Sequence, residues 1–312
     1  MDMVLDMVMP WDTEDIITVT CQGCGAEVTL DENITSDECP FCDANILADK
    51  HSKKAIKPKS LLSFKVPKDS AVDEFSKWVK GRWFAPNKLK HFARIGKMNG
   101  MYMPFWTYDS RTSTSYSGMR GEYYYTTETY TTTVNGKTVT RTRQVRHTRW
   151  YPASGMVRNS FDDILILGST SLPRKYAEKL EPWDLNNLVP YSHDFLQGFR
   201  VESYSVNLKE GFADAREKMR PTIRETVRRD IGGDTQRIHS INTHYDDVTF
   251  KHILLPVWIS TYHFRQKVYR ILVNARTGEV QGERPWSWVK ISFAVLTLIA
   301  IITVIIYFFM MR

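Results

Sequence analysis

The sequence predicts an α+β protein with a small cysteine-rich module at its N-terminus, a duplicated α+β body, and a single C-terminal transmembrane helix. Three observations lead to this prediction. All four cysteines lie in one short N-terminal window, segments of alternating and helical periodicity repeat through the middle, and residues 291–311 carry no charge. A chain of 312 residues with 42% hydrophobic content is also long enough to bury an ordinary core.

The cysteine-rich module occupies residues 1–50. Cys21 and Cys24 form one Cys-x-x-Cys pair, Cys39 and Cys42 form the other, and fourteen residues separate the two pairs. At this spacing two tight turns can each offer two thiolates to one tetrahedral ion. We therefore expect a zinc ribbon in which all four cysteines bind Zn²⁺. A rubredoxin-like iron site, a redox dithiol and a pair of disulfides are the alternatives.

The residues around the cysteines indicate what this module does. A shell of four cysteines has no open position for water, so we expect the metal to stabilise the fold and not to catalyse a reaction. Residues 27–30 are expected to form a short strand. The first 50 residues hold 12 acidic residues and one basic residue. Because an acidic ribbon repels phosphates, a protein contact or a structural role is favoured over nucleic-acid binding.

Residues 286–312 are predicted to be a transmembrane anchor. The 21 uncharged residues from Ile291 to Met311 would span about 31 Å as a helix, close to the hydrocarbon thickness of a bilayer. Trp286 and Trp288 precede this stretch and further aromatic residues close it, which is typical of a helix that reaches both interfaces.

Two features favour the cytoplasmic side for the soluble part. The first 15 residues contain five acidic residues and no Lys or Arg, which differs from a secretory signal peptide. All cysteines are used in the ribbon, so none is left for disulfides elsewhere. Only Arg312 follows the uncharged stretch. We therefore expect a membrane protein with a single-pass C-terminal anchor and its soluble part in the cytoplasm.

The body is predicted in three parts. Residues 51–59 form a basic linker, residues 60–195 a first α+β unit, and residues 196–285 a second. Both units are expected to contain antiparallel sheets. In the first unit, Asn135 and Gly136 lie between segments rich in Tyr, Thr and Val, which predicts a long β-hairpin.

Two short motifs suggest that the two units are an internal duplication. Met103-Pro-Phe-Trp106 in the first unit matches Leu255-Pro-Val-Trp258 in the second, and each motif follows a predicted strand and helix. We expect Pro221 to kink or split the helix of the second unit.

The charge of the body indicates an anionic neighbour. Residues 51–312 have a net charge of +18, against −11 for the first 50. One arm of the predicted hairpin carries Arg141, Arg143, Arg146, Arg149 and His147. This arm could contact anionic lipid headgroups, a protein or phosphates. Cross-strand pairing and solubility are the alternative explanation.

No motif of a known enzyme class is recognisable, so we expect that the protein is not an enzyme. Residues 136–138 resemble the end of a phosphate-binding loop, but Thr131 stands where the first glycine of that loop belongs. There is also no dinucleotide-binding, serine-hydrolase or zinc-protease motif.

One cluster of polar residues is a candidate for a second metal or acid–base site. It consists of His239, His244, Asp246 and Asp247. Polar residues commonly collect in a turn before a strand, and this is the alternative explanation.

Several motifs are similar to those of a known family. They are CQGCG and CPFC at the cysteines, FAPNKLK at 84–90, MPFWTYD, LLPVW and VNARTGEV. With them the chain resembles, over most of its length, a bacterial family of membrane-anchored zinc-ribbon proteins often labelled as primosomal or PriA-like helicases. The motor motifs of a helicase are missing from this sequence. Relatives look like partners of flotillin-like SPFH proteins and PspA-type envelope-stress proteins, which implies a membrane scaffold.

We therefore expect a non-enzymatic, membrane-tethered zinc-ribbon adaptor that recruits protein partners to the cytoplasmic face of the membrane. By the resemblance, those partners are SPFH-like or PspA-like proteins of an envelope-stress system. The alternative is a membrane-associated nucleic-acid-binding zinc-ribbon protein, whose binding would weaken steeply with added salt.

Overall fold

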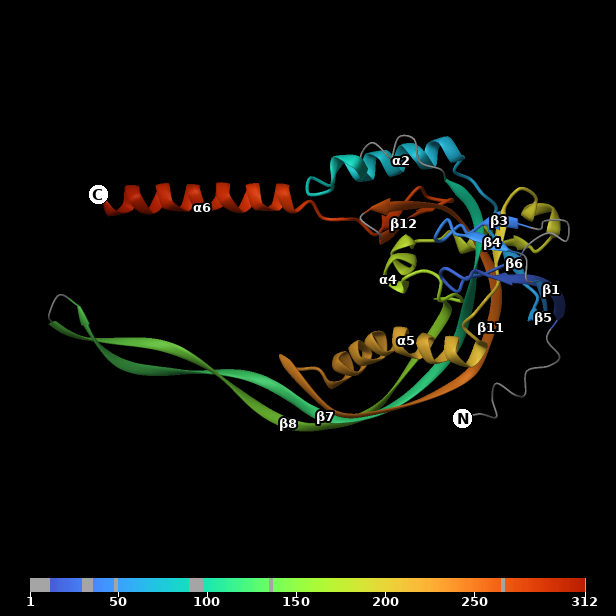
Figure 1. Cartoon of the computed structure of the whole chain (residues 1–312). Coiled ribbons are helices and arrows are strands. Elements are labelled where there is room, and N and C mark those ends of the chain that lie inside the picture. Colours follow the sequence, from blue (N-terminus) through green and yellow to red (C-terminus); the bar gives the residue numbers. More distant parts are fainter. Residues whose placement is uncertain are drawn as a thin grey trace. The chain divides into compact units, whose positions relative to one another are not determined.

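The structure, a computed structural model, is described for residues 12–29, 36–47, 50–89, 98–134, 137–264 and 267–311 (Figure 1). It has the predicted α+β character, with a mixed β-sheet and helices. The described residues form two compact units. Unit 1 contains Thr107–Leu165 and Phe212–Phe250, and unit 2 contains the others. Both units are therefore discontinuous, whereas the sequence predicted contiguous units over 60–195 and 196–285.

Unit 2 holds most strands of an 11-stranded sheet. They are β1 (Thr13–Thr20), β2 (Glu27–Thr29), β5 (Lys50–Ile56), β6 (Ser60–Leu61), β9 (Val189–Pro190), β10 (Arg200–Glu202), β12 (Lys267–Asn274) and β13 (Val280–Gly282). Three long strands have residues in both units: β7 (Asn99–Val134), β8 (Lys137–Leu167) and β11 (Thr235–Phe264). The order is β13-β12-β11-β7-β10-β2-β1-β5, with β6, β8 and β9 off this path.

The sheet is mixed, which corrects the prediction of antiparallel sheets. β10 runs parallel to β7, with Val201 opposite Tyr102. β6 runs parallel to β11, with Leu61 opposite Leu254. Long stretches of chain separate the two strands of each pair, as parallel pairing requires. Hydrophobic periodicity locates strands but does not reveal their direction, so the sequence did not predict these two pairs.

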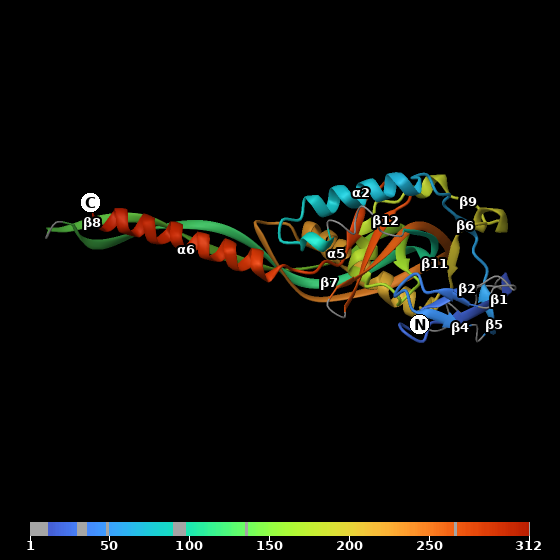
Figure 2. The ribbon, with the colours of Figure 1, turned by 45° about the horizontal axis from the view of Figure 1, so that its top comes forward.

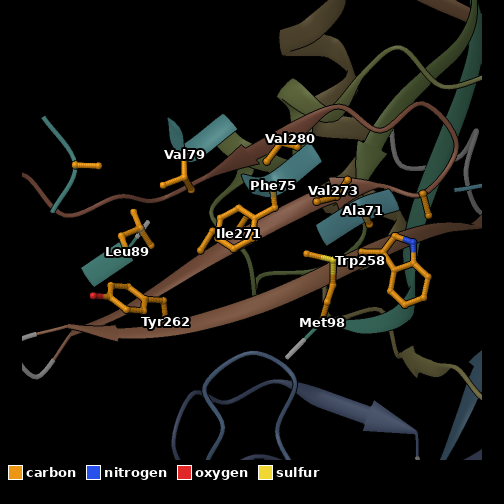
Figure 3. Close-up of a cluster of buried hydrophobic side chains, with 12 residues drawn as sticks. Ala71, Phe75, Val79, Leu89, Met98, Trp258, Tyr262, Ile271, Val273 and Val280 are labelled. Atoms are coloured by element: carbon orange, nitrogen blue, oxygen red, sulfur yellow. The ribbon is translucent and has the colours of Figure 1, made fainter. Parts of the chain in front are cut away.

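Helix α2 (Lys68–Lys80) packs on the strands of unit 2 (Figure 3). Its buried residues Ala71, Phe75 and Val79 recur every four positions and therefore lie on one face. They belong to one hydrophobic cluster with Ile271, Val273 and other strand residues. Each large apolar side chain buried in this way stabilises the fold by roughly 1.5–3 kcal/mol.

Helix α5 (Leu208–Ile231) is continuous through Pro221, so the expected split is not observed. Ala215, Met219 and Ile223 are buried at four-residue spacing and hold the helix on both sides of the proline. Pro221 lies on the exposed face. There, water can satisfy the carbonyl group that loses its helical partner.

Strands β7 and β8 pair with each other. β7 ends at Val134 and β8 begins at Lys137. The predicted turn residues, Asn135 and Gly136, lie outside the described residues. Most side chains of residues 124–133 and 137–151 are exposed. These segments therefore form a ribbon of two strands whose side chains are not needed to fill a core.

The predicted basic linker at 51–59 contains strand β5. It pairs antiparallel with β1, from Ile56 opposite Thr13 to Lys50 opposite Val19, and lies at the edge of the sheet (Figures 1 and 2). Lysines are common on edge strands because their charge prevents pairing with other chains. A lysine-rich strand shows little hydrophobic periodicity, which explains why the sequence indicated a linker.

Helix α6 (Trp288–Met310) occupies the segment predicted as the anchor. It is the one helix in the described part of the chain that is long and apolar enough to span a membrane. None of its most apolar 18 residues is buried within the protein. A helix this apolar and this exposed would be unfavourable in water.

Candidate metal centre

The four cysteines predicted as metal ligands lie together in unit 2. Their Sγ atoms are all within 4.8 Å of one another, and all four thiols are free. The Sγ atoms of Cys21 and Cys42 are 3.6 Å apart, as are those of Cys24 and Cys39. Ligands about 2.3 Å from a tetrahedral zinc ion are separated by about 3.8 Å. The arrangement therefore fits a four-coordinate metal ion.

The first cysteine pair lies on a tight turn between β1 and β2. The Cys21 amide donates to the Ala26 carbonyl at 2.9 Å, and the Gly25 amide donates to the Cys21 carbonyl at 2.8 Å. Gly25 has a φ of 74°, a conformation that glycine adopts without a steric cost. Val19 pairs with Val28 below the turn. The turn is thus built by its two flanking strands.

The second cysteine pair lies on a turn with the same hydrogen bonds. The Cys39 amide donates to the Ala44 carbonyl, and the Asp43 amide donates to the Cys39 carbonyl, both at 2.9 Å. Strands β3 (Ser36–Glu38) and β4 (Asn45–Leu47) flank this turn and pair antiparallel. Asp43 has a φ of 56° and takes the place that Gly25 has in the first turn.

The thiols influence one another in the absence of bound metal. A hydrogen bond from Cys39 lowers the pKa of the Cys24 thiol to about 5 and raises that of Cys39. Burial raises the pKa of Cys42 to about 11. Thiolates are the form that binds a metal ion, so binding has to release the remaining thiol protons.

The first turn is joined to the main sheet through β2. β2 pairs antiparallel with β10, with Val28 opposite Glu202. The Thr29 hydroxyl donates to the Val201 carbonyl at 2.8 Å, and the Ser203 amide donates to the Glu27 carbonyl at 3.1 Å. The metal centre is therefore continuous with the sheet and is not a separate module.

The second turn is joined to β11 and β12 by polar contacts. Arg270 Nε donates to the Phe41 carbonyl at 2.8 Å, and the Thr261 hydroxyl donates to Asp43 Oδ2 at 2.5 Å. Phe41 itself is fully buried. The sequence analysis did not identify the three polar side chains of these contacts, which belong to Asp43, Thr261 and Arg270. Only Asp43 carries a signal, because it directly follows the second pair as Gly25 follows the first.

A cavity of about 780 Å³ lies beside β1 in unit 2. The residues that line it include Ile16, Tyr191 and Phe199. His252 lies in its wall, where burial lowers the pKa of the ring to about 4 and keeps it neutral. His252 Nδ1 bonds to the Ile56 carbonyl at 2.8 Å, while Nε2 is buried without a partner among the described residues. His252 thus contributes a buried, neutral ring to the wall of this cavity.

The second candidate site, His239 to Asp247, is not assembled as expected. These residues lie within strand β11 and not in a turn before a strand. His244 Nε2 is 3.0 Å from Asp246 Oδ1, with both side chains exposed, whereas Asp247 pairs with Arg111. Among the described residues, these four side chains do not form a group that is close enough together to hold a metal ion.

A group of three carboxylates in unit 1 was not predicted. Ligand oxygens of Asp109, Asp162 and Asp163 lie within 4.8 Å of one another. The Asp163 amide donates to Asp109 Oδ1 at 2.8 Å, and the Thr249 hydroxyl donates to Asp109 Oδ2 at 3.0 Å. Through these bonds the Asp109 carboxylate of β7 links β8 and β11.

Comparisons with known proteins give one similarity. No family model matches the chain, and no solved structure matches it. The chain is similar to the uncharacterised protein YdjG of Bacillus subtilis (strain 168), with 26% identity over 251 residues, covering 80% of this chain and 70% of that protein. YdjG is uncharacterised, so the function has to be argued from the metal centre, the exposed strands and α6.

Proposed function

We propose that this protein is a non-enzymatic adaptor, tethered to the membrane by α6, which recruits protein partners on the cytoplasmic face. The exposed ribbon of β7 and β8 is the observation that carries the proposal. Tyr124, Tyr125 and Tyr130 are exposed there, next to several arginines. Tyrosine and arginine are the residue types that contribute most of the binding energy at protein interfaces.

The arginines and tyrosines of this ribbon are paired across its two strands. Arg146 lies 4.3 Å from the centre of the Tyr123 ring, and Arg149 lies 5.2 Å from that of Tyr124. Such contacts hold the side chains in defined positions on an exposed surface. Binding a partner then costs less side-chain entropy, which favours a recognition surface over a merely solubilising one.

Crosslinking followed by affinity purification of the full chain from solubilised membranes tests this proposal. We expect specific protein partners with the wild type and their loss in the double variant Tyr125→Ser, Arg146→Gln. Glu225→Gln, an exposed change on α5, is the matched control and should keep all partners. Identical partner sets in the wild type and the double variant would count against the ribbon as the recruiting surface. SPFH-like and PspA-like proteins are the first partners to look for.

We infer that the ion held by the four cysteines is Zn²⁺. A closed set of four thiolates at tetrahedral spacing suits zinc, and the sequence lacks the thioredoxin-like pattern of a redox dithiol. Metal analysis of the purified chain should give one zinc per chain. Iron with a visible charge-transfer absorption would contradict the assignment.

A membrane-associated nucleic-acid-binding protein is the second candidate. Exposed arginines and stacked aromatic rings on the β7 and β8 ribbon are also the groups that bind single-stranded nucleic acid. Filter binding at several salt concentrations tests it, because phosphate contacts weaken steeply with salt. Absence of retained DNA or RNA at low salt would remove this candidate.

We also propose that the body arose by internal duplication. Trp106 Nε1 donates to the Val206 carbonyl at 2.9 Å, and Trp258 Nε1 donates to the Val66 carbonyl at 2.8 Å. Each tryptophan belongs to one of the two matching sequence motifs. Each acceptor belongs to the strand-to-helix connection of the other repeat, so the two contacts are reciprocal.

Backbone contacts support the same proposal. The Gly168 amide donates to the Pro104 carbonyl at 2.9 Å, and the Ala275 amide donates to the Pro256 carbonyl at 3.1 Å. Both prolines occupy the second position of their motif. The parallel pairs β10 with β7 and β6 with β11 are reciprocal in the same way. Two repeats that exchange their first strands would produce this pattern.

A further inference from the structure

A turn that follows α2 is hydrogen-bonded to the start of α6. The Ser287 amide donates to the Phe84 carbonyl at 2.8 Å. The Lys290 ammonium group donates to the Ala85 carbonyl at 2.8 Å and to Asn87 Oδ1 at 2.9 Å. All five residues belong to unit 2. These bonds fix the turn to the first residues of the candidate membrane span.

The turn is itself held by the core. The Arg82 amide donates to the Val79 carbonyl and the Ala85 amide donates to the Arg82 carbonyl, both at 3.0 Å. Ala85 and Leu89 are fully buried. The backbone of the turn is therefore ordered, and residues between these anchors have defined positions.

Exposed aromatic and basic residues lie in this turn and in the segment that leads into α6. Trp83 is 74% exposed, and Trp286 and Trp288 are 51% and 71% exposed. The Arg284 guanidinium lies 4.3 Å from the centre of the Trp286 ring. Burial, and then the positive charge of Arg82, lower the pKa of Arg284. Two arginines near the start of a candidate membrane span, one of them against a tryptophan ring, favour an anionic partner.

The position of this surface along α6 identifies its partner. Lys290 is charged and the following 21 residues are not, so a bilayer crossed by α6 has its interface at the start of the helix. Phe84 is bonded to that start, and Trp83 is its neighbour. Tryptophan prefers the headgroup level of a bilayer, where its ring is partly buried and its N–H stays hydrated.

We propose that Arg82, Trp83, Arg284 and Trp286 form a second contact with the bilayer, which does not span it and which binds anionic phospholipid headgroups. The contact rests on the proposed membrane anchoring by α6. A single helix alone leaves its soluble part free to rotate and tilt. A second contact on the same unit fixes the orientation of unit 2 at the membrane surface.

Tryptophan fluorescence of the full chain in vesicles tests this contact. The vesicles contain phospholipids brominated near the headgroup end of the acyl chains, which quench only nearby tryptophans. Trp83→Ser and Trp288→Ser are compared with the wild type. We expect each variant to lose a quenchable component of comparable size. Both changes are at exposed positions, so zinc content should stay unchanged and confirm folding.

The two variants separate the possible failures. If Trp288→Ser loses the quenchable component and Trp83→Ser does not, the second contact is overturned and anchoring by α6 stands. If neither variant differs from the wild type, the start of α6 is not at the interface and the membrane anchoring fails as well.

Lipid charge tests the role of the two arginines. Vesicles with equal small fractions of brominated anionic or brominated zwitterionic phospholipid are compared. We expect the anionic lipid to quench the wild type more strongly, and Arg82→Gln with Arg284→Gln to remove the difference. Equal quenching of the wild type by both lipids would overturn the proposed anionic headgroup binding.

Discussion

At the scale of single residues, Asp43 has two roles in the second cysteine turn. Its φ of 56° is unusual for a residue other than glycine, and the Thr261 hydroxyl donates to its carboxylate. Asp43 corresponds to Gly25, which has the same backbone sign and no side-chain contact to make. Compared with glycine, the aspartate is less favourable in this backbone conformation but gains a hydrogen bond from Thr261 of β11.

Replacing Asp43 separates these roles. Asp43→Gly removes the hydrogen bond with Thr261, and glycine adopts the left-handed backbone conformation without strain. Asp43→Ala removes the same contact but keeps a Cβ in the left-handed region, which costs roughly 1–2 kcal/mol relative to glycine. We expect Asp43→Ala to release metal to a chelator faster than Asp43→Gly. Equal release rates in the two variants would show that the backbone conformation does not matter.

Glu202 makes the stability of the protein depend on pH. It is buried, Ser169 donates to its Oε1 at 2.6 Å, and burial raises the pKa of the carboxyl to about 7. The pKa of Glu202 in the folded protein is above the unfolded value of 4.5. Its stabilising contribution to the free energy of unfolding is therefore fully present below pH 4.5 and is lost as pH rises through about 7.

Glu202→Gln removes this titration. We expect the variant to be more stable than the wild type at pH 8, by up to roughly 3 kcal/mol, and closer to it at pH 6. Thermal unfolding in detergent at the two pH values measures the difference. Glu225→Gln, an exposed change, should show none. A pH-independent difference for Glu202→Gln would mean that the carboxyl is not protonated in the fold.

The four metal-ligating candidates could be predicted from sequence, whereas their supporting residues could not. Cys21, Cys24, Cys39 and Cys42 have a spacing that reports directly on a shared ion. Arg270 lies far from them in the chain, and its bond to the Phe41 carbonyl depends on the tertiary fold. Local patterns carry no information about such contacts.

At the scale of elements, the cysteine turns and the main sheet depend on each other. β2 carries the first turn and pairs with β10. β3 and β4 carry the second turn and pair only with each other in the sheet order. A metal ion bound by all four cysteines would therefore link the second hairpin directly to the first.

Removing the metal should loosen β2 and β10 before other strands. After treatment with a chelator, we expect faster hydrogen exchange at the Ser203 amide, which donates to the Glu27 carbonyl. The Asp234 amide, which donates to the Gly121 carbonyl, is the internal control, because both residues lie in unit 1 and the four cysteines lie in unit 2. Equal acceleration in both places would indicate global unfolding and contradict a local role for the metal.

Two elements show what hydrophobic patterns can and cannot predict. α2, the helix predicted before the Met103-to-Trp106 motif, could be predicted because its apolar residues have helical spacing. β5 could not, because four of its seven residues are Lys or His and the strand is held mainly by its pairing with β1. Edge strands have less need for an apolar face, so their sequences resemble linkers.

At the scale of the whole molecule, the cysteine ribbon is part of the body. The sequence predicted a module over 1–50 separated by a linker, but β1, β2 and β5 belong to the same sheet as β10 and β7. Motif spacing defines the ligands and not the boundary of the domain that contains them. The duplication proposal is likewise a statement about tertiary contacts that two short motifs only suggested.

The proposed duplication makes a symmetric prediction for its two tryptophans. Trp106→Phe leaves the Val206 carbonyl without its indole donor, and Trp258→Phe does the same to the Val66 carbonyl. Each loss should cost roughly 1–3 kcal/mol, because a polar group that stays buried loses its partner. We expect similar decreases in the thermal midpoint, measured on the full chain in detergent.

The double variant makes the test sharper. Trp106 and Trp258 donate to different acceptors, so their effects should add if each repeat is held independently. If the reciprocal contacts instead stabilise one shared arrangement of the two repeats, the first substitution weakens the second contact as well. The double variant then loses less stability than the sum of the single variants. A large cost for one tryptophan and none for the other would contradict equivalent repeats.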